Sequence, residues 1–247
     1  MLFRSPDGVA LANAPGVHDA STAELAVTLS LALLRGVPDF VRAQDDGRWA
    51  ADETIRRRAL ANQRVLVVGF GGVGRAVATR MLAFETTVTG VATRPRAPGA
   101  DGVPVHGVEQ LPELLPQHDV VVLATPLTEA TRGLVDETFL AAMPDGAVLV
   151  NVARGPVVDT DALVAELRRG RLLAALDVTD PEPLPAGHPL WSAPGALISP
   201  HAGGATSAFL PRAVALLREQ LESLSTRRRP RGIVVPSTWT ESLSAGT

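Results

Sequence analysis

The chain of 247 residues contains no cysteine, no lysine and no tyrosine. Without cysteine it can form no disulfide, thiolate metal site or cysteine nucleophile. Without lysine it can be neither a Schiff-base enzyme nor a P-loop nucleotide hydrolase, because both need the lysine amine. A short-chain dehydrogenase, which uses a tyrosine and a lysine, is excluded as well. All 23 basic side chains are arginines.

Long apolar runs and strong charge are also missing. No apolar run reaches the length of a membrane span, and the first eight residues, MLFRSPDG, lack the apolar core of a secretory signal. The net charge of −3 gives no support for a nucleic-acid or membrane-surface partner. We therefore expect a globular cytoplasmic protein with no nucleic-acid partner, no membrane partner and no metal site.

An apolar helix is predicted near the start of the chain. Ser21 and Glu24 have the spacing of a capping box, and leucines follow at intervals of four residues. The helix should end at about Arg35, because Gly36 and Pro38 follow. A second long helix is predicted near the other end, over residues 207–224.

Between these two helices, apolar strands alternate with helices. Nearly continuous apolar strands are typical of a parallel sheet that is covered on both faces. The pattern therefore predicts an α/β fold, a Rossmann-type doubly wound parallel sheet. The expected strands are residues 64–68, 87–91, 120–124, 147–152, 172–178 and 197–199.

The first of these strands runs into a glycine-rich loop, and a helix follows it. In the pattern G-x-G-x-x-G, Gly69 permits a sharp turn, Gly71 lets the backbone approach a pyrophosphate, and Gly74 lets the helix pack close to the strand. The amino end of the helix offers N–H groups and a positive dipole to the anion. With both flanking elements in place, the loop predicts a dinucleotide site. Its members are Gly69, Phe70, Gly71, Gly72, Val73 and Gly74.

The end of the second strand bears on the choice of cofactor. NAD-binding proteins of this type place an acidic residue here to bond the ribose 2′-hydroxyl. This chain has Ala92 there, followed by Thr93, Arg94 and Arg96, which can receive a 2′-phosphate. We therefore expect NADP(H) to be preferred. A solvated loop on an enzyme that also accepts NAD(H) remains the alternative.

Polar residues follow three later strands of the expected sheet. Arg154 follows one strand, Asp177 ends the next, and Glu182 and His201 lie in loops beyond it. Glu182 and His201 are nineteen residues apart, so they can meet only if both loops return to one crevice. Singly, a structural histidine and a solvated glutamate would be the ordinary interpretations. Beside the glycine loop and Arg154, they form a more specific combination.

With these blocks in this order, the sequence resembles the D-isomer-specific 2-hydroxyacid dehydrogenase family from about residue 10 to residue 236. The resemblance implies a catalytic set of Arg154, Glu182 and His201, with Asp177 near the nicotinamide. The region after the second strand is similar to that of NADP-linked glyoxylate and hydroxypyruvate reductases. Further cofactor contacts are expected from Thr125, Pro126, Thr128, Val152, Ala153, His201 and Gly203.

The chemistry of such a family needs these residue types. When hydride reaches the carbonyl carbon of a 2-keto acid, the oxygen becomes an alkoxide, and His201 can supply its proton. In the direction of 2-hydroxy acid oxidation the same ring acts as the base. Glu182 would fix its tautomer, and Arg154 would bind the substrate carboxylate with a planar fork. Glu182 argues against formate dehydrogenase, which resembles this set with a glutamine there.

The resemblance also implies a domain division and a homodimer. Residues 1–17 are expected to be a remnant of a substrate lobe, 18–205 the dinucleotide-binding domain, and 206–247 a helix and tail returning to that lobe. Because most of the lobe is not in this sequence, we expect NADP(H) binding but slow turnover. The dimer contact is expected near the helix over 21–35 and the segment 38–49. The rival interpretation is a non-catalytic, dinucleotide-binding regulatory or scaffold protein.

Overall fold

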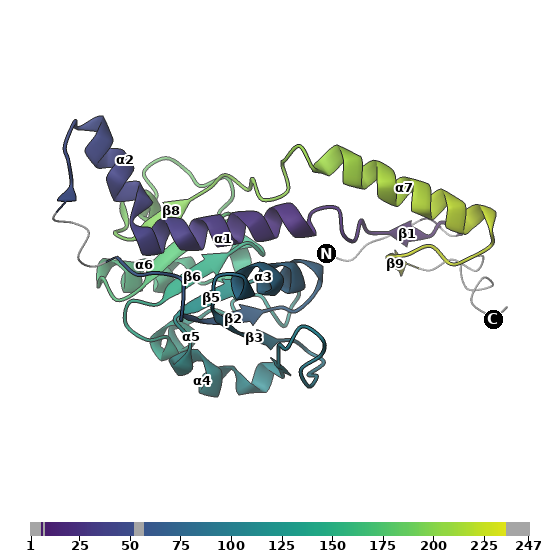
Figure 1. Cartoon of the computed structure of the whole chain (residues 1–247), viewed down its shortest axis with the longest axis horizontal. Coiled ribbons are helices and arrows are strands. Elements are labelled where there is room, and N and C mark those ends of the chain that lie inside the picture. The colour runs from purple at the N-terminus through teal and green to yellow at the C-terminus, as the bar shows by residue number, and fades with distance from the viewer. Residues whose placement is uncertain (1–5, 7, 52–56, 236–247) are drawn as a thin grey trace.

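The centre of the molecule is a parallel sheet of seven strands in the order β4-β3-β2-β5-β6-β7-β8 (Figure 1). The structure is a computed structural model, which describes residues 6, 8–51 and 57–235. The sheet confirms the predicted Rossmann-type fold. Its strands are β2 (Arg64–Val68), β3 (Thr87–Val91), β4 (Val105–His106), β5 (Val120–Leu123), β6 (Val148–Asn151), β7 (Leu173–Leu176) and β8 (Ala196–Ile198).

Helices cover both faces of this sheet because its strands are apolar on both faces. Leu66 and Val68 of β2 belong to one buried cluster, and Val65 and Val67 to the other. Burying each such side chain contributes about 1.5–3 kcal/mol. The first cluster is closed by α4 (Leu111–Leu114), α5 (Glu137–Ala142) and α6 (Thr160–Arg168), and the second by α1 (Asp19–Arg35) and α3 (Gly72–Leu82).

The chain order reverses between β2 and β5, which lie side by side in the sheet. The first three strands run from β2 toward β4, and the later ones run from β5 toward β8. Ligands of open α/β sheets bind at such a switch point, beyond the carboxyl ends of the strands. Since all seven strands are parallel, every loop that follows a strand leaves from this same edge.

The predicted start of the first helix is wrong. α1 begins at Asp19 with His18 at its N-cap, so Ser21 lies inside the first turn. Its hydroxyl is buried and donates to the carbonyl of His18, 3.4 Å away. The helix starts two residues before Ser21, and Asp19 is favoured there because an acidic side chain suits the first turn of a helix.

A second helix, α2 (Val37–Asp45), was not expected. Gly36 has φ +68°, and this left-handed residue ends α1 and starts α2. Pro38 stops no helix here because it lies in the first turn of α2, where its missing N–H is not needed. In the described part of the chain no single helix is long and apolar enough to cross a membrane. α1 and α2 pass that test only as a pair, which is bent by 66°.

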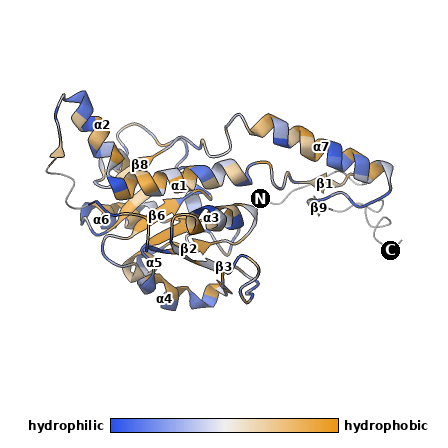
Figure 2. Cartoon of the chain, in the orientation of Figure 1, coloured by the Kyte–Doolittle hydropathy of each residue, from blue (hydrophilic) through white to orange (hydrophobic). Residues whose placement is uncertain are grey.

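The last helix, α7 (Phe209–Ser225), projects away from the sheet (Figure 1). Beneath it, β1 (Leu11–Ala12) pairs with β9 (Ile233–Val235). α7 has no buried residue, and apolar side chains are exposed along it (Figure 2). The division of the chain at residues 17 and 205 stays a prediction.

Candidate active site

The glycine loop joins β2 to α3 at the switch point. Gly69 has φ +97°, and a Cβ there would lie 2.6 Å from the backbone of Ala124 and Thr125, which follow β5. A Cβ on Gly74 would lie 2.0 Å from the carbonyl oxygen of Gly69. Both glycines are therefore required by the packing of the protein itself, and they bring α3 against β2.

The packing of the protein does not require a glycine at position 71. It caps α3 in an extended conformation, and a Cβ there would meet no atom within 4 Å. The open space lies in front of the first N–H groups of α3, where an anion is favoured. A dinucleotide pyrophosphate fits this cradle, because its close approach would explain the missing side chain.

A fourth glycine brings an acidic residue to the same loop. A Cβ on Gly72 would lie 2.1 Å from a carboxylate oxygen of Asp19, the first residue of α1. The carboxylate therefore rests where a side chain of residue 72 would be. Sequence reasoning missed Asp19 because nothing in the spacing of the two segments shows that the start of α1 reaches the loop.

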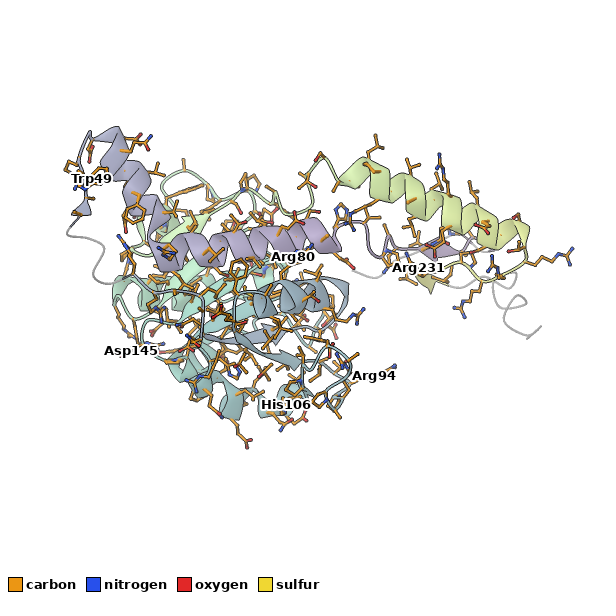
Figure 3. The ribbon with its side chains drawn as sticks, in the orientation of Figure 1. Trp49, Arg80, Arg94, His106, Asp145 and Arg231 are labelled. Carbon is orange, nitrogen blue, oxygen red and sulfur yellow. The ribbon has the colours of Figure 1, made fainter. Side chains whose placement is uncertain are left out.

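The loop after β3 carries the residues expected to choose the cofactor. The Phe70 ring packs against Gly90, and the Arg96 guanidinium lies 5.4 Å from the centre of that ring. Arg96 also forms an ion pair with Asp101, with a shortest distance of 2.6 Å. Arg94 is exposed and forms no ion pair with any described residue (Figure 3). Thr93 and Ala92 lie in the same loop, next to the end of β3.

The loop after β5 is held by one threonine. The Thr131 hydroxyl donates to the carbonyl of Pro126 over 2.6 Å, and the N–H of Thr128 donates to that hydroxyl over 2.8 Å. Because Thr125 lies against Gly69, this loop borders the glycine loop. The structure thus brings Thr125, Pro126 and Thr128 to the expected cofactor edge.

Arg154 follows β6 on a turn that Asn151 shapes. The Asn151 amide donates to the carbonyl of Arg154 over 3.1 Å, and its oxygen accepts from the N–H of Ala153 over 3.0 Å. The Arg154 side chain is exposed at the sheet edge. Val152 and Ala153, expected to contact the cofactor, have buried side chains, so only their backbone can face a ligand.

The loops after β6 and β7 touch each other. A Cβ on Gly155 would lie 1.9 Å from the carbonyl oxygen of Thr179, so only glycine permits this approach. The Thr160 hydroxyl also donates to the carbonyl of Asp180 over 2.8 Å. These contacts fix Arg154 relative to the segment that carries Glu182.

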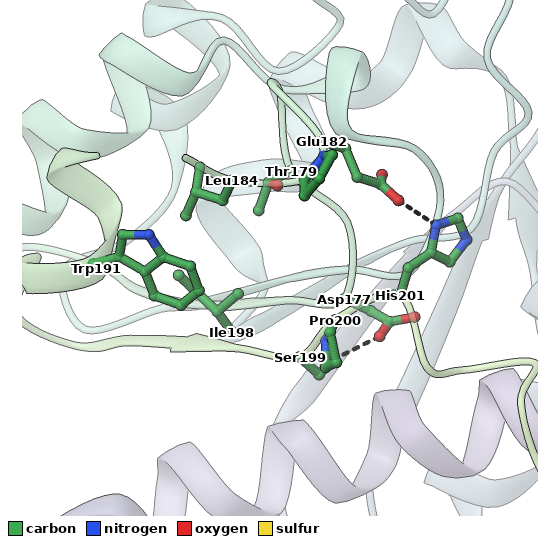
Figure 4. A pocket seen from close by; sticks show the side chains of 10 residues that line it. Asp177, Thr179, Glu182, Leu184, Trp191, Ile198, Ser199, Pro200 and His201 are labelled. Atoms are coloured by element: carbon green, nitrogen blue, oxygen red, sulfur yellow. Dashed lines mark hydrogen bonds and ion pairs between the residues drawn. The ribbon is translucent and has the colours of Figure 1, made fainter. Parts of the chain in front are cut away.

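Glu182 and His201 meet, as Figure 4 shows. The Nδ1 atom of His201 lies 2.6 Å from Oε1 of Glu182, and the two side chains are 45% and 40% exposed. His201 has φ +53°, a conformation that costs a residue other than glycine about 1–3 kcal/mol. Within the described residues Nε2 of His201 has no hydrogen-bond partner. The ring therefore offers a free nitrogen to a ligand while the carboxylate holds the other.

Asp177 holds the loop on which His201 stands. Its buried carboxylate accepts hydrogen bonds from the Ser199 hydroxyl (2.6 Å), the N–H of Ala202 (2.8 Å) and the N–H of Gly203 (3.0 Å). The N–H of His201 also donates to the carbonyl of Asp177 over 2.8 Å. That Asp177 and Gly203 also contact a cofactor stays a prediction.

A cavity of about 560 Å³ adjoins the Glu182–His201 pair (Figure 4). Leu184, Trp191 and Ile198 form its apolar side. The Trp191 indole N–H donates to the carbonyl of Pro185 over 3.0 Å, which fixes the ring. No group of three or more histidine, aspartate or glutamate side chains in the described ranges could hold a metal ion.

Several supporting residues escaped the sequence reasoning. Each of them contacts a loop that carries a predicted site residue, and none is itself predicted to bind a ligand. They are Ser199, Asn151, Thr131 and Asp19. A signal existed for two of them. Asn151 is a polar residue at the end of an apolar strand, and Ser199 precedes His201 by two positions at the end of another.

The sequence and structure were compared with known proteins. Residues 27–203 match the family model "D-isomer specific 2-hydroxyacid dehydrogenase, NAD binding domain". The glyoxylate reductase/hydroxypyruvate reductase of Homo sapiens is 37% identical over 205 residues, which are 81% of this chain and 62% of that protein. The chain thus spans less than two thirds of the length of this relative.

Two solved structures are similar over most of the chain. A D-isomer specific 2-hydroxyacid dehydrogenase from Xanthobacter autotrophicus Py2, in complex with NADPH and MES, is 35% identical with a TM-score of 0.79. The match covers 92% of each chain. The NAD-dependent formate dehydrogenase of Staphylococcus aureus, in complex with NAD, is 28% identical with a TM-score of 0.79, covering 93% of this chain and 70% of that one. The chain belongs to the D-isomer specific 2-hydroxyacid dehydrogenase family.

Proposed function

We propose that this protein is an oxidoreductase that transfers a hydride between NADP(H) and a 2-keto acid or D-2-hydroxy acid. The observation that carries the proposal is the His201–Glu182 pair, bonded over 2.6 Å at the sheet edge that also holds the glycine loop. The printed name of the human relative, glyoxylate reductase/hydroxypyruvate reductase, supports a small 2-keto acid as the substrate.

His201 is the proton donor to the substrate oxygen. Glu182 accepts from Nδ1, so the proton to be given away sits on Nε2, the nitrogen that faces no described residue. The hydrogen bond to Glu182 also holds the ring in one orientation toward the substrate oxygen. The bound dinucleotide would supply the hydride chemistry.

Arg154 binds the substrate carboxylate. Its guanidinium is exposed at the end of β6, and its main chain is fixed by Asn151 and by the close approach of Gly155 to Thr179. A guanidinium binds a carboxylate through two parallel hydrogen bonds, which orients the keto acid as well as attracting it. The substrate carbonyl can then lie toward His201.

NADP(H) is the preferred cofactor in this proposal, and NAD(H) the alternative. Ala92 places no carboxylate beside the ribose, and Arg94 has no ion-pair partner among the described residues, so it is available to a 2′-phosphate. The similar structure from X. autotrophicus contains NADPH, which supports this choice, whereas the one from S. aureus contains NAD.

The site is open in the described part of the chain. His201 and Glu182 keep 45% and 40% of their side-chain surface exposed, so water reaches the reacting groups. Holding reactants in a closed site contributes roughly 7–11 kcal/mol to catalysis in favourable cases. We expect the 247-residue chain to bind NADPH and to reduce 2-keto acids slowly.

A second copy of the chain is the proposed protein partner. α2 exposes Val37, Phe40 and Val41, and Trp49 beyond it is 94% exposed. A groove of about 700 Å³ is lined by Phe40 and Trp49. Such an apolar surface on one arm of the molecule is typical of a subunit contact.

The proposed function is tested by NADPH oxidation under single-turnover conditions with glyoxylate, hydroxypyruvate and a longer 2-keto acid. His201→Ala should lower the rate about 10²–10⁴-fold while NADPH binding, followed by fluorescence, barely changes. Arg154→Lys should be almost as slow as Arg154→Ala, because an ammonium lacks the planar fork. Equal rates in wild type and His201→Ala would remove His201 from the mechanism. NADPH binding without any keto-acid reduction would instead favour the regulatory or scaffold protein.

A further inference from the structure

The loop beyond β3 folds back and fixes the main chain of Arg96. The N–H of Arg96 donates to the carbonyl of Val105 over 2.8 Å, and the N–H of Val105 donates to the carbonyl of Arg96 over 3.1 Å. This bridge ties the loop to β4, the outermost strand beside β3. Arg96 is therefore held in place, whereas the neighbouring Arg94 extends from the molecule (Figure 3).

The guanidinium of Arg96 is enclosed on two sides. Phe70, a residue of the glycine loop, lies beneath it at 5.4 Å from the ring centre. Asp101 binds its two terminal nitrogens at 2.6 and 3.5 Å. A Cβ on Gly99 would lie 2.9 Å from Nη1, so the glycine lets the loop close around the cation.

Asp101 is itself well positioned to keep this contact. Its Oδ1 accepts from the N–H of Val103 over 3.2 Å, so the carboxylate is held by the loop it closes. The hydrogen bond from Arg96 is the largest influence on this carboxyl and lowers its pKa below the usual value of 3.8. Asp101 is thus ionised at neutral pH and neutralises Arg96.

We propose that Asp101 is a specificity-determining residue, which competes with the 2′-phosphate of NADP(H) for the guanidinium of Arg96. The inference rests on the proposed dinucleotide site. The Arg96 guanidinium packs over the ring of Phe70, so its positive charge lies next to the glycine loop. Asp101 occupies the fork formed by the two terminal nitrogens, so a 2′-phosphate can bind this fork only by displacing the carboxylate.

The consequence is a weaker preference for NADPH than two arginines would give. Arg94 acts alone in wild type, while Arg96 contributes only after its pair with Asp101 is broken. The negative charge of Asp101 also opposes the approach of the phosphate. NADH lacks the phosphate and leaves the pair intact, so its affinity does not depend on Asp101.

The test compares NADPH and NADH affinities of wild type and Asp101→Asn by fluorescence titration at low salt. The amide oxygen still accepts from Val103, so the loop is kept. Because an exposed ion pair such as Arg96–Asp101 contributes only a small free energy, breaking it costs little. We therefore expect NADPH to bind about 3- to 10-fold more tightly to Asp101→Asn. NADH affinity should change less than about twofold.

Two further variants make the test specific. Arg96→Ala, added to Asp101→Asn, should remove the gain in NADPH affinity. Asp145→Asn removes the same charge ahead of β6, at the opposite edge of the sheet, and should change neither affinity. Asp145 is 86% exposed in its side chain.

The outcomes separate the inference from the proposed function. If wild type binds both nucleotides and Asp101→Asn leaves their ratio unchanged, or weakens NADPH, Asp101 does not compete with the phosphate. A gain in NADPH affinity that survives Arg96→Ala would also overturn the inference, because the effect would be general charge. If wild type binds neither nucleotide, the proposed dinucleotide site itself fails.

Discussion

Replacing Gly71 by alanine should abolish tight dinucleotide binding without unfolding the protein. A Cβ at this position meets no protein atom within 4 Å, and the backbone, with φ −76° and ψ −155°, is open to any residue. Alanine loses less backbone entropy than glycine, a gain of about 0.4–1 kcal/mol. Alanine is also a poorer N-cap than glycine, by an amount of similar order, about 0.5–1 kcal/mol. The free energy of unfolding should therefore stay within about 1 kcal/mol of wild type.

The effect on binding should be much larger. The added methyl group would occupy the cradle in front of α3 and push a pyrophosphate away from the helix N–H groups. A hydrogen bond to a charged group is worth about 1.5–3 kcal/mol, so losing one or two lowers the affinity by about 10- to 1,000-fold or more.

Gly74→Ala is the matched control. The same methyl group would lie 2.0 Å from the carbonyl oxygen of Gly69, and this oxygen belongs to backbone that cannot move freely. We expect a loss of about 3 kcal/mol or more in the free energy of unfolding. Urea denaturation measures the stability of both variants, and NADPH fluorescence measures binding.

Two results would refute this reasoning. If Gly71→Ala binds NADPH as wild type does, the loop is not the pyrophosphate cradle. If Gly71→Ala is as unstable as Gly74→Ala, then Gly71 is also required by the packing of the protein and not by the approach of a ligand.

The remaining predictions concern the cofactor, the loop of His201, pH and assembly. Arg94→Ala should weaken NADPH by roughly 1.5–3 kcal/mol and leave NADH unchanged, and Ala92→Asp should shift preference toward NADH, both measured by titration; equal weakening of both nucleotides would show that Arg94 only supports the fold. Asp177→Asn should lower the free energy of unfolding by about 2–4 kcal/mol in urea, because the buried N–H of Gly203 loses its acceptor; a wild-type value would show that the loop holds itself. Burial lowers the pKa of His118 below its usual 6.5, so unfolded chains bind its proton more readily. The free energy of unfolding should therefore be full above about pH 6.5 and fall as the pH drops below it, and His118→Gln should flatten that slope; an unchanged slope contradicts the assignment. Light scattering at micromolar concentration should show a dimer that Trp49→Ser weakens, and a 25.8 kDa monomer alone would exclude it.

The fold was predictable because its signals are local. A strand that is buried on both faces must be apolar along its buried length. β5 is apolar throughout, and β2 and β6 are apolar except for Arg64 at the start of one and Asn151 at the end of the other. The cofactor loop was equally visible, since turn, strand and helix are contiguous between residues 64 and 82. The pairing of Glu182 with His201 followed from which loops leave the same edge.

What sequence reasoning missed depends on contacts between distant segments. β4 is only two residues long and pairs at the edge of the sheet, so no periodicity marks it. β1 and β9 are far apart in the chain and each too short to be recognised alone. The ion pair of Arg96 with Asp101 depends on how a proline- and glycine-rich loop closes, which residue types do not specify.

The exposed helix α7 should open at a lower free energy than the central sheet. Helices in proteins owe most of their stability to packing of an apolar face, and none of the 17 residues of α7 is buried. Its first residue, Phe209, stacks on His18 with ring centres 5.3 Å apart. Nearer its other end, Gln220 donates to the carbonyl of Arg231 over 2.7 Å, so α7 is held by a few exposed contacts and not by a core. Amide hydrogens of α7 should therefore exchange with solvent through local opening, long before those of β5, whose exchange requires global unfolding. A surface that covered Leu210, Leu217 and Leu221 would slow exchange in the helix and leave the sheet unaffected.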